Sequence, residues 1–240
     1  MTNRSERASV LDSAKTVSFS RFSPHTATRV ESEEMAEAFG RAFATSPWYE
    51  WKKCRVAPCR AHWGIEHRKE LEALQYLHCG EPVVDFWPRD AVLYDLYHEI
   101  GADTSCWVAR ERKRVIGFSW GYPISVPELS QKAGIRLEGP VGLLFGSHSR
   151  VAYQDELGVL SSYRGTGVAR ELFSLRLDDF LKQGLEIGIV RTRALPESSV
   201  TYLWFTEKLG YRELARYPGD DGRVILGQRL DEVKKLLSSK

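Results

Sequence analysis

The chain has 240 residues, with 34 Lys and Arg against 32 Asp and Glu and a formal net charge of +2. This length corresponds to one or two domains, and a charge so close to neutral gives no reason to expect a nucleic-acid partner or an acidic membrane surface. The apolar content of 42% is ordinary for a globular chain, and it excludes disorder, collagen, a coiled coil and a disulfide scaffold as the overall class.

Targeting and membrane segments are not visible in the sequence. Residues 1–15 are polar and charged and lack the apolar run of a signal peptide. No stretch approaches the roughly 18 apolar residues of a membrane span. The four cysteines are too few for a disulfide framework in a chain of this length, which favours reduced thiols. These observations predict a cytoplasmic protein without a membrane partner.

The N-terminal region is expected to contain a tail, one strand and one helix. Residues 1–15 are predicted to be a flexible tail, and apolar and polar residues alternate over 16–22 as in a strand. Ser32 is expected to cap the helix that follows, and Pro47 to end it.

Residues 47–100 are predicted to form a helical, Trp-rich insertion, with helices over about 65–77 and 89–100. Basic residues lie between the aromatic ones, as in Trp51, Lys52 and Lys53. Such a stretch could stack on nucleic acid, or its aromatic side chains could pack on a sheet as a helical lid. The near-neutral net charge favours the lid, so no nucleic-acid partner is predicted.

The second half of the chain is expected to contain a hairpin, a long loop rich in glycine and proline, and then alternating strands and helices. The predicted elements, in chain order, are strands over 105–110 and 115–122, a loop over 123–149, a strand over 151–159, a turn over 160–166, a helix over 167–181, a strand over 185–191, a helix over 196–209, strands over 211–217 and 223–229, and a tail over 231–240.

The most informative segment joins the strand over 151–159 to the next helix through a turn that contains Gly165 and Gly167. Such a turn presents backbone N–H groups that have no intrahelical partner, and the positive end of the helix dipole lies beside them. Together these groups form an anion site suited to a pyrophosphate, and glycine allows close approach of the backbone. The turn alone is equally compatible with a simple reversal of the chain.

Two motifs give this turn a family context. Arg164, Gly167 and Ala169 form an Arg-x-x-Gly-x-Ala pattern, and about 40 residues later residues 199–213 include Glu-Lys-Leu-Gly-Tyr. Together they resemble the GNAT superfamily of acyl-CoA-dependent N-acyltransferases over residues 105–230, and more loosely over 16–44. The resemblance implies an α/β fold with one mixed, mostly antiparallel central sheet, helices on both faces and a splayed central strand. It also implies a single domain over 16–230.

The resemblance also implies a co-substrate and the residues that hold it. Acetyl-CoA or another acyl-CoA would insert as a pseudo-strand at the splay. Backbone groups of Leu157 and Val159 would bind its pantetheine amides. The full set of cofactor-binding residues that the two motifs imply is Leu157, Val159, Arg164, Gly165, Thr166, Gly167, Val168, Ala169, Ser199 and Phe205.

The catalytic residues are less well determined by the resemblance. The family's usual general acid, a tyrosine, corresponds to Thr206, which has a shorter reach and is a poorer acid. Tyr202, one helical turn earlier, is the first substitute, although it could equally be packed on the sheet. Glu156 and then Asp155 are the candidate general bases, and one of the two could simply face solvent.

The implied reaction is direct transfer of an acetyl group to a primary amine of a small molecule, peptide or protein. Acyl transfer to a thiol acceptor, such as a carrier-protein pantetheine, uses the same donor site and stays open. A sensor that binds acyl-CoA without turnover is a third possibility. We expect the insertion over 47–100 and the loop over 123–149 to cover the acceptor side. Oligomeric state is left as monomer or homodimer.

Metal binding is considered because Cys54 and Cys59 are followed by further histidines and cysteines, namely His62, His67, His78 and Cys79. Structural zinc sites usually repeat two compact ligand pairs. Here His78 and Cys79 are adjacent, which makes simultaneous ligation awkward. The sequence therefore favours free thiols and surface histidines, and no metal is predicted.

Overall fold

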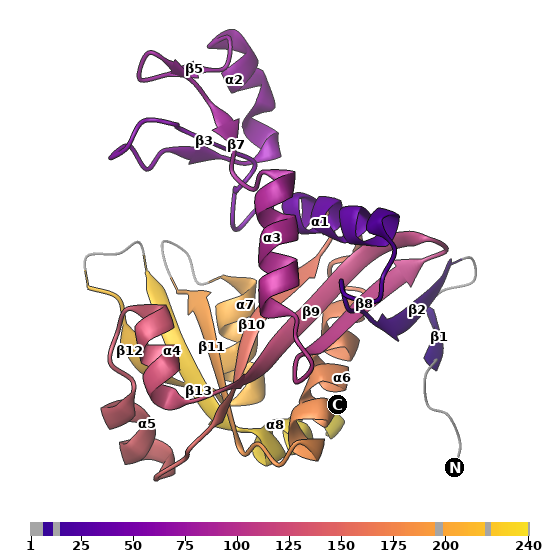
Figure 1. The fold of residues 1–240 in the computed structure, drawn as a ribbon, viewed down its shortest axis with the longest axis vertical. Helices are drawn as coiled ribbons and strands as arrows, with labels where there is room; N and C mark the ends of the chain where they lie inside the picture. Colours follow the sequence, from indigo (N-terminus) through magenta and orange to yellow (C-terminus); the bar gives the residue numbers. More distant parts are fainter. Residues whose placement is uncertain (1–6, 12–14, 195–198, 219–221, 240) are drawn as a thin grey trace. The chain divides into compact units, whose positions relative to one another are not determined.

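The computed structural model describes residues 7–11, 15–194, 199–218 and 222–239 (Figure 1). The chain divides into two compact units. The first unit contains Met1–Gly101, Trp107–Phe118 and Gly158–Leu172, and the second contains Ala102–Cys106, Ser119–Leu157 and Phe173–Lys240. Both units combine strands with helices, and the predicted mixed α/β fold is confirmed. No helix among the described residues is long and apolar enough to cross a membrane.

The first unit contains β1 (Arg7–Leu11), β2 (Lys15–Arg21), most of β8 (Ser105–Glu111) and the first part of β9 (Arg114–Ile124), in the strand order β1-β2-β8-β9. The strand predicted over 16–22 is β2, which pairs antiparallel with β1 and with β8. Helix α1 spans Arg29–Phe43 and begins at Thr28, whose side chain accepts a hydrogen bond from the Glu31 backbone. The prediction of Ser32 as the cap was wrong, because Thr28 and Glu31 form a reciprocal capping box one turn earlier.

The insertion over 47–100 combines short helices with five two-residue strands, so the prediction of a helical insertion was right only in part and missed the strands. Three two-residue strands form one small sheet in the order β4-β3-β7, and β5 pairs with β6 in a hairpin. The bounds are β3 Lys52–Lys53, β4 His62–Trp63, β5 Leu77–His78, β6 Glu81–Pro82, β7 Val84–Asp85, α2 Arg68–Ala73 and α3 Arg89–Glu99. Helix α3 matches the helix predicted over 89–100, and the 3₁₀ segment Ile65–His67 followed by α2 covers most of the one predicted over 65–77. The strands were not predicted, because two residues are too few to produce a visible alternation.

The second unit contains the strand order β9-β10-β11-β13-β12, with β10 at Val151–Val159, β11 at Ile187–Arg193, β12 at Arg212–Arg216 and β13 at Arg223–Arg229. Strand β10 pairs parallel with β11, whereas β11 and β12 both pair antiparallel with β13. The strands predicted in this region are therefore present, with ends shifted by a few residues.

Helices cover both faces of the second unit's strands. One core places Leu129 of α4 (Val126–Ala133) and Val141 of α5 (Glu138–Phe145) with Ile189. The other places Phe180 of α6 (Val168–Lys182) and Val233 of α8 (Leu230–Ser238) among its buried residues. The tail predicted over 231–240 is thus largely helix α8.

The long loop predicted over 123–149 is also wrong, because its glycines and prolines mark the ends of two helices. Ser125 caps α4 by accepting from the Glu128 backbone, and a proline lies in the first turn of that helix. Gly134, with φ of 67°, ends it in the left-handed region. These residue types delimit a helix here rather than exclude one.

Candidate functional site

The glycine turn that follows β10 lies within the first unit from Gly158 onward. A short 3₁₀ segment over Ser161–Tyr163 leads to exposed residues 164–167, and α6 begins at the buried Val168. Gly165 and Gly167 have φ values of 77° and 91°, which a side chain would strain. The predicted arrangement, a glycine-containing turn that opens directly into a helix, is therefore present, and its backbone faces solvent.

The turn is fastened at two points to neighbouring parts of the first unit. The backbone N–H of Leu160 donates to the Ile116 carbonyl at 2.9 Å. The Tyr163 hydroxyl donates to the Glu111 carboxylate at 2.8 Å, and this hydrogen bond is the main reason why the pKa of Tyr163 is raised. An anion that binds at this turn would therefore meet a backbone already held in place.

The Arg164 side chain contacts protein carbonyls. Its Nη2 donates to the carbonyl of Ala42 at 2.8 Å and to Oγ1 of Thr45 at 2.9 Å, and its Nε donates to the carbonyl of Val159 at 3.2 Å. Its Nη1 donates to the carbonyl of Ser46. The guanidinium group thus connects the end of α1 to the start of the turn. Because this group is occupied by protein acceptors, Arg164 would contact a ligand through its backbone.

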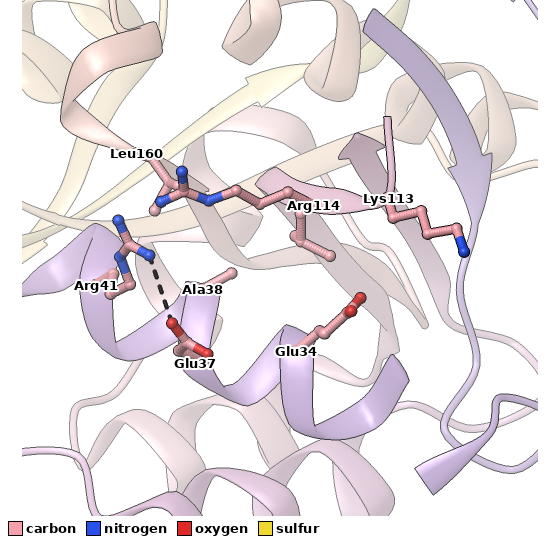
Figure 2. A pocket seen from close by; sticks show the side chains of 8 residues that line it. Glu34, Glu37, Ala38, Arg41, Lys113, Arg114 and Leu160 are labelled. Carbon is pink, nitrogen blue, oxygen red and sulfur yellow. Dashed lines mark hydrogen bonds and ion pairs between the residues drawn. The ribbon is translucent and has the colours of Figure 1, made fainter. Parts of the chain in front are cut away.

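A pocket of about 320 Å³ lies beside the turn within the first unit (Figure 2). Leu160 lines it together with residues of α1 and the β8–β9 hairpin. The guanidinium groups of Arg41 and Arg114 point toward one another beside Leu160, whereas Lys113 points away (Figure 2). Arg41 also forms an ion pair with Glu37 at 3.4 Å.

In the second unit, β10 and β11 separate after a short paired stretch. Their register runs only from Ala152 and Gly188 to Gln154 and Val190, although both strands continue for several residues. Over 155–157 the main-chain groups of β10 therefore have no ladder with β11. This is the splay that the family resemblance predicts, and Asp155, Glu156 and Leu157 lie at its start.

Asp155 belongs to a polar cluster on the α4 face. Its carboxylate accepts from the Tyr122 hydroxyl at 2.8 Å and lies 3.4 Å from the Lys132 ammonium, while its side chain is only 4% exposed. Burial, followed by the charge of Asp155, raises the pKa of Tyr153 well above its usual value, so this phenol stays protonated. Desolvation acts to lower the pKa of Arg191, but Tyr153, Asp155 and Glu156 raise it above its usual value.

Strand alternation places Glu156 on the opposite face from Asp155. The Glu156 carbonyl accepts from Nη1 of Arg176 at 2.7 Å, and the same nitrogen donates to the Trp120 carbonyl at 2.8 Å. Arg176 is 1% exposed, and burial lowers its pKa to about 10, which leaves it charged at neutral pH. A buried cation therefore fixes the backbone where the two strands part.

Arg176 and Thr192 are two further polar residues at buried positions, and the sequence analysis missed Arg176. The Thr192 hydroxyl on β11 is buried and has no hydrogen-bond partner among the described residues. A buried polar group without a partner is uncommon, although Ser32 and Ser119 have the same property in the described part of the chain. Arg176 could have been found, because it is a charged residue spaced four residues after Leu172 on the buried stripe of α6.

The second motif lies at α7 (Val200–Leu203) and the π-helical segment Trp204–Lys208. Ser199 caps α7, and its hydroxyl donates to the Arg193 carbonyl at 2.7 Å. Thr206, which occupies the position of the family's tyrosine, donates to the Tyr202 carbonyl at 2.9 Å. Phe205 is buried in the core, with its ring 5.7 Å from Phe173.

These hydrogen bonds bear on the roles predicted for Ser199 and Tyr202. The Ser199 and Thr206 hydroxyls already donate to carbonyls, whereas Tyr202 is partly buried on the surface of the core. Tyr202 and Thr206 are four residues apart, so they lie on neighbouring positions of one helix face. Residues 196–198, which begin the helix predicted over 196–209, lie outside the described residues.

Comparisons with known proteins agree with the motifs and the fold. The family model described as acetyltransferase (GNAT) family matches residues 65–196, which is more than half of the chain. The GNAT domain of S. lividans PAT is 12% identical, covers 93% of this chain and 96% of that one, and gives a TM-score of 0.53. A protein from Desulfovibrio desulfuricans described in the GNAT acetyltransferase family is 12% identical, covers 89% and 99%, and gives 0.50. No curated protein matches the chain. The match over residues 65–196 shows that the chain belongs to the GNAT acetyltransferase family.

Proposed function

We propose that the protein transfers an acetyl group from acetyl-CoA to a primary amine of a small molecule, peptide or protein. The observation that supports this most strongly is the early end of the β10–β11 ladder at Gln154 and Val190. A parallel pair that parts in this way leaves backbone donors and acceptors to which an extended amide chain can add as a strand. Pantetheine, with its two amides, has the required chemistry.

The pyrophosphate of the co-substrate is assigned to the backbone of 164–169. Gly165 and Gly167 have no side chains that would keep a phosphate away from the backbone of the turn. The exposed main chain of the turn leads into the N-terminus of α6. The helix dipole and the partnerless N–H groups of the first turn favour an anion there. Arg164 acts on this site as a positioning residue through its hydrogen bonds to Ala42 and Val159.

The thioester end is assigned to the start of the splay. Backbone groups of Leu157 and Val159 would bind the pantetheine amides, and a backbone N–H of β10 would polarise the thioester carbonyl. The hydroxyl of Thr192 on β11, which has no partner in the part of the chain that the structure describes, offers a further hydrogen-bonding group. Phe205 and Ser199 would act indirectly, because the first is buried in the core and the second caps α7.

Glu156 is the better candidate for the general base. Asp155 is almost fully buried and already bound to Tyr122 and Lys132, so it has little room to meet an acceptor amine. Glu156 is partly exposed, and Arg176 holds its carbonyl in place. We assign proton removal to Glu156. We assign to Asp155 a positioning role, in which it holds Tyr122 and Lys132 in the polar cluster that faces α4.

In the reaction, the amine nitrogen attacks the thioester carbon and the carbon–sulfur bond breaks. Glu156 takes the proton that the nitrogen loses, and the thiolate of CoA leaves and takes up a proton. Tyr202 is the candidate donor of that second proton, because Thr206 already donates to a carbonyl. A thiolate is a stable leaving group, so the contribution of Tyr202 is expected to be modest.

The experiment combines binding with turnover in the full chain. Acetyl-CoA at ~100 times its dissociation constant should stabilise the fold by about 2.7 kcal/mol, which thermal unfolding would detect. Release of CoA thiol is then followed with a panel of amines, peptides and carrier-protein thiols. No thermal shift with any acyl-CoA would refute the proposal. Binding without turnover on any acceptor would identify a sensor, and turnover on thiols alone would replace the amine acceptor.

A further inference from the structure

Four residues of the insertion that can bind a metal lie together, although nothing in the acyl-transfer proposal uses them. They are Cys54, Cys59, His78 and Cys79, and their ligand atoms all lie within 4.8 Å of one another. The Nδ1 atom of His78 lies 3.8 Å from Sγ of Cys59 and 3.3 Å from Sγ of Cys79. All four belong to the first unit, so their proximity is a property of that unit alone.

The two S···N separations are close to those of a tetrahedral zinc site, and all the ligand atoms lie within 4.8 Å of one another. Zinc bonds of about 2.3 Å to sulfur and about 2.0–2.1 Å to nitrogen place the S···N edges at about 3.6 Å and the S···S edges at about 3.8 Å. The two S···N distances, 3.8 and 3.3 Å, lie within a few tenths of an ångström of that value. Three thiolates and one imidazole also form a donor set typical of structural zinc.

The adjacency of His78 and Cys79, which led the sequence analysis to predict no metal, is resolved by the turn that contains them. Strands β5 and β6 pair His78 with Glu81, so Cys79 and Gly80 are the two residues of the loop. Both have positive φ values, 51° and 77°, as in the tight turns that join twisted strands. This turn directs the Cys79 thiol back toward the imidazole that precedes it.

A non-glycine residue in the left-handed region is itself informative. Cys79 would be expected to avoid this conformation, for which Asn or Gly is the usual choice. The loop that holds the other two thiols is closed by backbone hydrogen bonds from Cys54 to the carbonyl of Ala61 and from Cys59 to that of Val56, both 2.9 Å long. Two separate turns thus bring their cysteines to one point.

The segment also has little else to stabilise it. Its apolar cluster contains three buried residues, Cys54, Trp63 and Leu71, and its strands are two residues long. Segments with such small cores usually need a disulfide or a metal. Cys54 is buried and Cys59 partly so, which places two of the ligands at the edge of this cluster.

We propose that Cys54, Cys59, His78 and Cys79 bind one zinc ion that stabilises the insertion. Binding releases the thiol protons to solvent and leaves four protein ligands around the ion, so the site is closed and structural rather than catalytic. This inference goes beyond acyl transfer and does not depend on it, because the site residues named for that reaction lie outside the insertion.

The first test uses the unaltered full chain, purified with a reductant and without chelator. Metal analysis should find one zinc per chain, and titration of the thiols with an organomercurial should release it in proportion. Exchange into cobalt(II) should give the visible absorption bands of a tetrahedral thiolate site. Zinc-free protein that also fails to take up zinc or cobalt, with its thiols reduced, overturns the proposal.

The second test compares variants inside and outside the cluster. Cys59→Ser and Cys79→Ser should each lower the zinc content at least about tenfold, whereas Cys106→Ser and His62→Gln, which lie outside the cluster, should keep one zinc per chain. Should the cluster variants fail to fold, the mercurial titration of the unaltered chain still decides the matter. Retention of zinc by Cys59→Ser and Cys79→Ser, or a disulfide among the native cysteines in place of the metal, counts against the site.

Discussion

Arg164 offers the sharpest test of how the anion-binding turn works. The side chain spans the end of α1 and the start of the turn, with hydrogen bonds of 2.8 Å to Ala42, 2.9 Å to Thr45 and 3.2 Å to Val159, and another to Ser46. If these contacts define its role, Arg164 holds the backbone that binds a phosphate. If Arg164 instead pairs with the phosphate, these hydrogen bonds are incidental.

The magnitude follows from the hydrogen bonds. A typical one contributes a net ~0.5–1.5 kcal/mol, and the solvent exposure of Arg164 removes much of the extra strength of a charged donor. Because the four contacts belong to one group and are not additive, we expect Arg164→Ala to lower the free energy of unfolding by about 1–2 kcal/mol. For a chain of this size that corresponds to a fall of about 3–6 °C in Tm.

The assay measures Tm without ligand and the Kd of acetyl-CoA at several salt concentrations. We expect Arg164→Ala to weaken acetyl-CoA binding and to leave the slope of log Kd against log salt unchanged, because no charge contact to the ligand is lost. Arg164→Lys keeps the charge but lacks the planar fork, so it should restore little of either quantity.

A different pattern would refute the positioning role. An unchanged Tm in Arg164→Ala, together with a shallower salt slope and recovery of affinity in Arg164→Lys, would mean that the side chain neutralises a phosphate directly. Loss of stability without any change in acetyl-CoA affinity would separate the turn from the ligand altogether, and would place the pyrophosphate elsewhere.

Three further predictions concern the strands at the splay. Glu156→Gln should lower kcat about 10²-fold with the KM for acetyl-CoA little changed, and a kcat within a factor of two of the unaltered protein would remove Glu156 as the base. Thr192→Val should preserve or slightly raise Tm, because it deletes a buried hydroxyl that has no partner among the residues described, and should weaken acetyl-CoA binding measurably by calorimetry; unchanged affinity would leave that hydroxyl without a role. Gly158→Ala should destabilise the fold by about 1–3 kcal/mol in urea unfolding, because the added carbon would lie 2.2 Å from the Phe118 ring. Gly139→Ala, where the added carbon meets nothing within 4 Å, is the control, and equal stability of the two variants would contradict the packing argument.

The parts of the fold that the sequence predicted well are those with a local signal. Strand β10, the glycine turn and α6 follow one another without interruption, and each has a periodicity or a turn residue that marks it. The same holds for β8 and β9, where a charged turn joins a continuous apolar run to an alternating one. Their ends moved by only a few residues, because hydrogen bonding at an element's ends depends on neighbours that the pattern does not include.

The parts that were missed depend on pairing between distant residues or on the context of one residue type. Proline and glycine over 123–149 suggested a loop, yet they delimit α4 and α5, since the same residue that breaks a helix interior also begins or ends one. The strands of the insertion are two residues long and exist through their partners. His78 and Cys79 are adjacent in sequence and were therefore not expected to bind one metal ion. The φ of 51° at Cys79 directs its thiol back toward the His78 imidazole.

Two buried polar residues, Arg176 and Thr192, lie on the elements that form the proposed binding site. Arg176 occupies a core position of α6 and holds two carbonyls at the point where β10 leaves β11, although its helix was predicted from apolar spacing alone. Burying a guanidinium costs free energy unless hydrogen bonds compensate for it. Placing Arg176 in the core therefore fixes the backbone of β10 at a cost in folding stability. The Thr192 hydroxyl on the adjacent strand is buried and has no hydrogen-bond partner within the described ranges, which is unfavourable for stability. An apolar residue at either position would avoid this cost, so the retention of both residues beside the splay is consistent with the acyl-CoA site proposed there.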